Sequence, residues 1–312
     1  MLTVSEETAV DYELTAKIAT EAFALADVQF SAERIKWLYE RAFGRGTIVL
    51  AAIEDGRKIG QIAMIGQSIC IAGEIYPAVQ LVDLFLLQAY RSAHVVRKLY
   101  KAVEHVCAAR NIRYMLALPN DKSAPLNARF LKLNPVLWMP IRAGVSLRRP
   151  ASGTIAHTGL LKSMTRDQAI ELLAPFMGST DENGSQWDAR TLFDRLDDPT
   201  RGYAVHATKN LLLVSSRRMA KGVGYTALCA FFARSSTKPG EDEVDDLVRA
   251  ACRLWKLPAF VYAGANSRLC KLPGTSLPAR LRRPILVQLR DTSTDAHNIR
   301  FDRFQLIDSD FA

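Results

Sequence analysis

Apolar positions along the chain predict alternating strands and helices. An apolar run ends at Leu87, a polar turn spans residues 88–94, and from Val95 onward apolar residues recur at spacings of three and four. This spacing predicts an amphipathic helix, and Asn111, which tolerates the left-handed conformation, marks its end. Residues 112–118 form a second apolar run, typical of a buried strand. Strand, turn, helix and strand in this order predict two parallel strands joined by a right-handed crossover.

The turn after Leu87 has the features of an anion site. A helix start offers backbone N–H groups without intrahelical acceptors, together with the positive end of the helix dipole. Arg91 and Arg97 add fixed positive charge beside it. These features together predict that a phosphate binds there.

Two further elements precede this unit along the chain. Residues 31–41 are predicted to form a helix with Ser31 as its N-cap. Residues 48–64 read as two strands joined at Glu54–Gly56, and an Asp-Gly pair in such a turn is a strong hairpin signal.

The same order of elements returns later in the chain, at an offset of about 156 residues. A predicted helix at 185–198 resembles that at 31–41, with Arg190 aligned to Arg34 and Phe193 to Trp37. The predicted elements that follow it are strands at 203–207, 211–215 and 225–233, a helix at 244–255, and strands at 259–263, 284–290 and 300–307. A basic and then Pro/Ser/Gly-rich segment at 148–153 marks the boundary, so we expect domains at 1–147 and 154–312.

In these residues the chain resembles the GNAT superfamily of N-acyltransferases. The family's pyrophosphate loop has the form Tyr-Arg-Gly-x-Gly-x-Gly, and residues 90–96 read Tyr-Arg-Ser-Ala-His-Val-Val. Residues 119–123 resemble the block after the family's fifth strand, and residues 131–134 resemble its later Lys-Leu-Gly signature. The resemblance covers residues 1–147. It implies an α/β (α+β) fold with a mixed central sheet flanked by helices, and a second, degenerate GNAT-like half.

The resemblance also implies roles for particular residues. The backbone N–H of Leu86 or Leu87 would polarise the thioester carbonyl, and Asn120 and Ser123 would contact the pantetheine arm. The pyrophosphate of coenzyme A would lie on the loop and helix start formed by Arg91, Ser92, Ala93, His94, Val95, Val96 and Arg97.

The chain departs from the family pattern in two places. Ser92, His94 and Val96 stand where small residues are usual, and glycine there lets the backbone approach a pyrophosphate closely. The family's acid, a Tyr shortly after the fifth strand, is missing, and Asn127 and Phe130 occupy that region. Relatives that take acyl chains from acyl carrier protein need only the pantetheine arm, so a carrier protein is an alternative donor.

Asp83 is the candidate general base. An alkyl amine has a pKa near 10.4, so its deprotonation at pH 7 costs about 4.6 kcal/mol, part of which a base removes. Asp83 lies mid-strand among apolar residues, where a carboxylate is costly unless it is paired or functional. The alternative is a structural carboxylate paired with an arginine or with backbone donors. Tyr76, after a polar turn, is a candidate substrate contact, and His94 is interpreted as a loop residue rather than a base.

Composition limits the remaining classes of function. The net charge is +9, which suits a solvated basic surface, a polyanionic cofactor or an acidic carrier protein. The basic clusters match no nucleic-acid motif, and no apolar stretch has the length of a membrane span. The five cysteines are unpatterned, and the acidic segment 241–246 suits a helix start, so we expect no metal site. The cysteines and the polar N-terminus favour a cytoplasmic protein.

Three functions follow from the sequence. The first is an N-acyltransferase that moves an acetyl or other acyl group from acetyl-CoA or acyl-CoA to a primary amine by direct attack. The second is an enzyme resembling N-acyl amino acid synthases that takes a long acyl chain from acyl carrier protein. The third is a non-catalytic GNAT-like module that binds a ligand or a partner.

Overall fold

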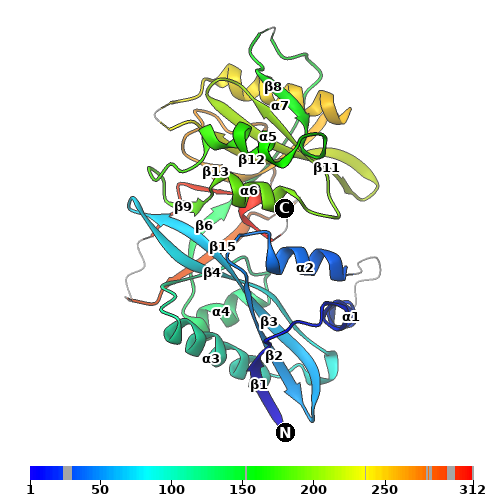
Figure 1. The fold of residues 1–312 in the computed structure, drawn as a ribbon, viewed down its shortest axis with the longest axis vertical. Coiled ribbons are helices and arrows are strands. Elements are labelled where there is room, and N and C mark those ends of the chain that lie inside the picture. Colours follow the sequence, from blue (N-terminus) through cyan, green and yellow to red (C-terminus); the bar gives the residue numbers. More distant parts are fainter. Residues whose placement is uncertain are drawn as a thin grey trace. The chain divides into compact units, whose positions relative to one another are not determined.

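Contacts divide the chain into two compact units, which Figure 1 traces by sequence colour. The structure, a computed structural model, describes residues 1–23, 30–151, 153–235, 237–278, 280, 283–293 and 299–310. Unit 1 comprises residues 1–68, 76–136 and 286–299, and unit 2 comprises residues 69–75, 137–285 and 300–312. The domain boundary expected between residues 147 and 154 stays a prediction. Two residues considered from the sequence, Arg282 of a basic cluster and the isolated His297, lie outside the described residues.

Unit 1 contains a mixed sheet in which β4 (Glu74–Leu86) lies beside β3 (Arg57–Ile71) and β5 (Tyr114–Ala117). The β4–β5 pair is parallel, as the crossover pattern predicted. The outer strands are antiparallel to their neighbours: β2 (Thr47–Glu54) on β3, β1 (Leu2–Glu6) on β2, and β15 (Ile285–Asp291) on β5. The predicted β2–β3 hairpin is confirmed, with Asp55 and Gly56 in the left-handed region at φ 49° and 79°.

Helices cover both faces of this sheet (Figure 1). On one face, α3 (Ala93–Ala109) buries Val95, Leu99 and Val103, the positions that its sequence spacing selected. On the other face, α1 (Tyr12–Phe23) packs against Phe85 and Leu87 of the β4 end. The remaining elements are α2 (Ala32–Glu40), capped by Ser31 as predicted, the 3-10 turn η1 (Gln88–Tyr90), α4 (Ser123–Leu131) and β6 (Asn134–Met139).

Unit 2 repeats the central elements of unit 1. β10 (Tyr203–Ala207), β11 (Leu211–Ala220) and β12 (Val223–Ala233) are antiparallel, and α7 (Glu241–Trp255) then crosses to β13 (Ala259–Asn266), which is parallel to β12. The acidic residues 241–243 lie in the first turn of α7, where their negative charges interact favourably with the positive end of the helix dipole. The other elements are β7 (Ile141–Val145), β8 (His157–Leu160), η2 (Leu161–Ser163), α5 (Arg166–Leu173), η3 (Ala174–Phe176), β9 (Gly184–Gln186), α6 (Ala189–Leu196), β14 (Thr275–Ser276), β16 (Arg303–Gln305) and η4 (Leu306–Asp308).

Two predicted elements of unit 2 are shorter in the structure. The helix expected from residue 185 begins at Ala189, because the Asp188 carboxylate accepts the N–H groups of Arg190 and Thr191 at 2.8 and 2.9 Å and so caps it there. Residues 184–186 form β9 instead. The strand expected at 300–307 is reduced to β16, since the chain turns into η4 at Leu306.

A buried imidazole in β10 predicts how stability depends on pH. His206 is fully buried between Thr158 Oγ1 at 2.9 Å and Ser215 Oγ at 2.8 Å, and burial lowers its pKa from 6.5 to about 3. Between these values the unfolded chain binds a proton that the folded chain does not. Stability should therefore fall by about 1.4 kcal/mol per pH unit as the pH drops below 6.5, from this residue alone.

Urea unfolding at several pH values measures this slope in the wild type and in two variants. His206→Gln should reduce the slope, whereas His105→Gln, at an exposed position on α3, should leave it unchanged. An equal slope in wild type and His206→Gln would contradict the assignment.

Candidate functional site

The ends of β4 and β5 separate in unit 1. Their parallel pairing ends at Leu81 and Ala117, and β4 then continues to Leu86 while β5 has ended. Leu87 N–H donates to the Ile59 carbonyl of β3 at 2.9 Å. Because successive N–H groups along a strand point to opposite edges, the Leu86 N–H points away from β3, into the space that β5 leaves.

A close approach of β3 holds this end of β4 in place. A Cβ on Gly60 would lie 2.3 Å from the Phe85 carbonyl oxygen, so the two strands can meet there only because residue 60 is glycine. Of the two predicted thioester donors, Leu86 is therefore available and Leu87 is bonded within the sheet.

The Asp83 carboxylate lies on the α1/α2 side of β4, three residues before Leu86. Its backbone has φ 49°, which interrupts the regular pleat of the strand. Asp83 Oδ2 accepts the hydroxyl of Tyr39 from α2 at 2.6 Å, and the Tyr39 oxygen accepts Gln61 Nε2 from β3 at 2.8 Å. Burial raises the pKa of Asp83, while the Tyr39 hydrogen bond and the charge of Arg34 oppose that rise.

The start of α3 presents free backbone donors, as predicted. Ser92 caps the helix: its Oγ accepts the Val95 N–H at 3.3 Å, and its carbonyl accepts the Val96 N–H at 3.2 Å. The N–H groups of Ala93 and His94 have no acceptor in the described chain, and both residues are exposed. This is the arrangement in which a helix start binds an anion.

The side chains of the predicted loop serve different purposes. Arg91 is committed to backbone carbonyls, since its Nε donates to Leu86 O at 3.1 Å and its Nη2 to Ala22 O. Val95 is buried and Val96 half-buried against the core of the unit. Arg97 is exposed, with its guanidinium carbon 5.7 Å from the centroid of the Phe130 ring.

Asn120 and Ser123 bond to each other in the turn that leads into α4. Asn120 Oδ1 accepts the N–H groups of Lys122 and Ser123 at 2.9 Å, and Ser123 Oγ accepts the Asn120 N–H at 3.0 Å. The predicted turn is thus present, and pantetheine contact stays a prediction. Asn127, where an acid was sought, accepts the buried Tyr100 hydroxyl at 2.6 Å.

Tyr76 is not brought together with the other predicted site residues. It lies at the opposite end of β4, ten residues from Leu86, which corresponds to roughly 30 Å of extended strand. There its ring packs against Tyr114 and the Arg113 guanidinium. Its position gives no support for substrate contact at the end of β4.

Sequence reasoning did not select Gln61 or Arg129, and it interpreted Tyr39 as a core aromatic rather than as a partner of Asp83. The helix pattern of residues 31–41 places Tyr39 on the buried face, but no local signal shows that its hydroxyl meets Asp83. The one available signal for this network was Gln61, a polar residue among the apolar residues of the predicted strand that became β3. Arg129 lies on α4 with its guanidinium carbon 5.3 Å from the Phe130 centroid, in a helix that carried no motif of its own.

The matching strand separation in unit 2 is closed by side chains. Pairing of β12 and β13 ends at Leu228 and Tyr262, and beyond it the Phe231 N–H donates to Gln305 Oε1 at 2.8 Å. The Phe231 carbonyl accepts both Gln305 Nε2 and Asn266 Nδ2 at 3.0 Å. The backbone N–H and carbonyl of Phe231 are therefore already hydrogen-bonded and are not available to a thioester in this separation.

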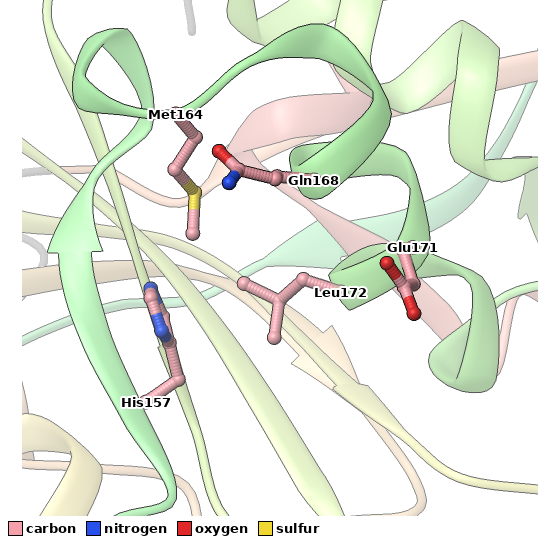
Figure 2. Close-up of a pocket in the computed structure, with 5 residues that line it drawn as sticks. All are labelled: His157, Met164, Gln168, Glu171 and Leu172. Carbon is pink, nitrogen blue, oxygen red and sulfur yellow. The ribbon is translucent and has the colours of Figure 1, made fainter.

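Unit 2 also contains a hollow of about 440 Å³ (Figure 2). His157 of β8 lines one side, and Met164, Gln168, Glu171 and Leu172 come from α5 and the residue before its cap. Burial lowers the pKa of His157, so the hollow presents a neutral imidazole beside apolar and polar groups.

The part of the chain that the structure describes contains neither a cluster of metal-binding side chains nor a helix able to span a membrane. Within those residues, no group of three or more His, Cys, Asp or Glu side chains is placed to hold a metal ion. None of the described helices combines the length and apolar character needed to cross a bilayer.

The fold is that of the GNAT N-acetyltransferases, built from two halves. A tandem GNAT protein from the clavulanic acid biosynthesis pathway superposes with TM-score 0.57 at 10% identity, covering 95% of this chain and 100% of its own. A GCN5-related N-acetyltransferase from Anabaena variabilis gives 0.63 at 9% identity, with 93% and 73% covered. The N-myristoyltransferase of Saccharomyces cerevisiae, solved with myristoyl-CoA, gives 0.61 at 12% identity, with 98% and 83% covered. By sequence, no protein-family model and no curated protein matches the chain.

Proposed function

We propose that the protein is an N-acyltransferase that moves an acetyl or longer acyl group from coenzyme A to a primary amine. The separation of β4 from β5 supports this most directly. It leaves the Leu86 N–H pointing toward an open strand edge, three residues beyond the Asp83 carboxylate. The structural neighbours with this fold include N-acetyltransferases and an N-myristoyltransferase.

The thioester would enter between the two strand ends. Its carbonyl oxygen would accept the Leu86 N–H, which stabilises the negative charge that develops there during attack. The free N–H groups of Ala93 and His94 would hold the pyrophosphate, which needs no side-chain contribution from the residues that replace glycine.

Asp83 would accept the proton of the attacking amine. As the amine nitrogen bonds to the carbonyl carbon, the carbon–sulfur bond breaks, coenzyme A leaves as its thiolate, and the amine proton passes to the carboxylate. A raised pKa makes Asp83 a better proton acceptor than an ordinary carboxylate. Tyr39 holds the carboxylate in place through its 2.6 Å hydrogen bond.

Two other functions remain as alternatives. The net charge of +9 and the loop without glycines favour a donor carried on acyl carrier protein. The missing tyrosine acid and the closed separation in unit 2 favour a module that binds a ligand without turnover.

Two measurements test these functions: the release of thiol with a panel of amines, and the change in the protein's melting temperature when each donor is added. Acetyl-CoA or long-chain acyl-CoA should raise the melting temperature and release thiol when the correct amine is present. A shift with acyl carrier protein alone would select the second function. Binding without release for every amine would favour the module, and the absence of both would contradict acyl transfer.

A further inference from the structure

Two arginines from different helices share one aromatic ring in unit 1. The guanidinium carbons of Arg97, on α3, and Arg129, on α4, lie 5.7 and 5.3 Å from the centroid of Phe130. Phe130 is fixed against the core of the unit and against the Tyr100 ring, whose centroid is 6.2 Å away. Both arginines are exposed, so the ring forms a platform that presents two cations to solvent.

No carboxylate in the described chain pairs with either arginine. The one acidic residue of α3, Glu104, is bound to Arg290 at 2.8 Å. Along the sequence, no aspartate or glutamate occurs between Asp121 and Asp167. Two guanidiniums therefore lie within 6 Å of the centroid of one ring without a counter-charge, which is an arrangement that a multiply charged anion would stabilise.

The position of this pair relative to the free helix start limits what the anion can be. Arg97 lies four residues after Ala93, which is about 6 Å along the helix axis. The Arg97 side chain thus begins about one helical turn beyond the Ala93 and His94 N–H groups, so the arginines and the helix start are two places at which one ligand can be held. The ligand would carry two separate phosphate groups.

We propose that Arg97 and Arg129 bind the 3′-phosphate of coenzyme A, while the start of α3 binds its pyrophosphate. This inference rests on the proposed acyl transfer and adds the identity of the donor. The phosphopantetheine arm of a carrier protein has no 3′-phosphate, so it would leave both arginines without a ligand. The arginine pair therefore selects free coenzyme A thioesters over carrier-bound acyl groups.

Calorimetric titration with coenzyme A and with 3′-dephospho-coenzyme A tests the proposal without knowledge of the acyl chain. The wild type should bind coenzyme A about 10- to 100-fold more tightly than the dephospho compound, as expected for charge-assisted hydrogen bonds to one phosphate. Arg97→Gln with Arg129→Gln should remove this preference, so that the two compounds bind the variant with equal affinity. Arg57→Gln removes the same charge at the exposed β2–β3 turn and should keep the preference.

Each result separates this inference from the function on which it rests. Equal binding of the two compounds by the wild type, with acyl transfer still observed, would overturn the 3′-phosphate site and leave the proposed function standing. A preference that survives in the double variant would place the 3′-phosphate elsewhere and also overturn it. If neither compound binds the wild type, the inference and the coenzyme A donor both fail.

Discussion

Asp83→Asn should lower the turnover number by two to four orders of magnitude, roughly the contribution of a positioned general base. The amide keeps the size of the side chain but cannot accept the amine proton. Donor binding should stay unchanged, because the carboxylate lies on the α1/α2 side of β4 while the donor would lie at the α3 start. Initial rates of thiol release and the thermal shift with coenzyme A measure the two effects separately.

The pH dependence of the rate gives an independent test of Asp83. Activity requires the charged carboxylate, so the rate should fall as the pH drops through the pKa of Asp83, which burial raises above 3.8. Tyr39→Phe removes a hydrogen bond that lowers this pKa, so it should move the acid limb to higher pH. Asp55→Asn, at the exposed β2–β3 turn, is the matched control and should behave as the wild type. Unchanged turnover in Asp83→Asn would reject Asp83 as the base.

Gln305→Ala should lower the free energy of unfolding by about 2–6 kcal/mol. Gln305 is fully buried, and its Oε1 accepts the Phe231 N–H at 2.8 Å and the Tyr262 hydroxyl at 3.0 Å. Removing the side chain leaves two buried donors without this acceptor, and each such donor costs about 1–3 kcal/mol. Urea unfolding, compared with the exposed control Gln88→Ala, measures the loss.

The same variant tests whether unit 2 is closed to a donor. Opening its strand separation exposes polar backbone, yet the start of α7, the helix that matches α3, carries Glu241, Asp242 and Glu243, whose charges disfavour a phosphate there. Calorimetry should therefore give one coenzyme A per chain in both wild type and Gln305→Ala. A loss of stability no larger than that of Gln88→Ala would contradict the role assigned to Gln305.

Local patterns in the sequence were sufficient to predict most elements of the two units. The apolar spacing after Val95 located α3, the Asp55-Gly56 turn located the β2–β3 hairpin, and Ser31 located the start of α2. Each of these signals depends on residues within one or two turns of each other, so it can be read without the fold.

The candidate site could be predicted only in part, because its contacts join distant segments. Asp83 was selected as a candidate because a carboxylate among apolar residues is conspicuous, but its hydrogen-bond partner Tyr39 lies 44 residues away in sequence. The commitment of Arg91 to the Leu86 and Ala22 carbonyls likewise depends on where α1 packs. The closure of unit 2 depends on Gln305, which no spacing connects to Phe231.

The return of β15 to the sheet of unit 1 affects the order in which the protein can be made. β5 pairs with β15 through residues 288–291, so its edge stays uncovered until that stretch has left the ribosome. An uncovered strand edge is a template for aggregation. A nascent chain that ends near residue 150 would therefore carry a half whose sheet is still incomplete, and residues 288–291 have to be made before its final assembly.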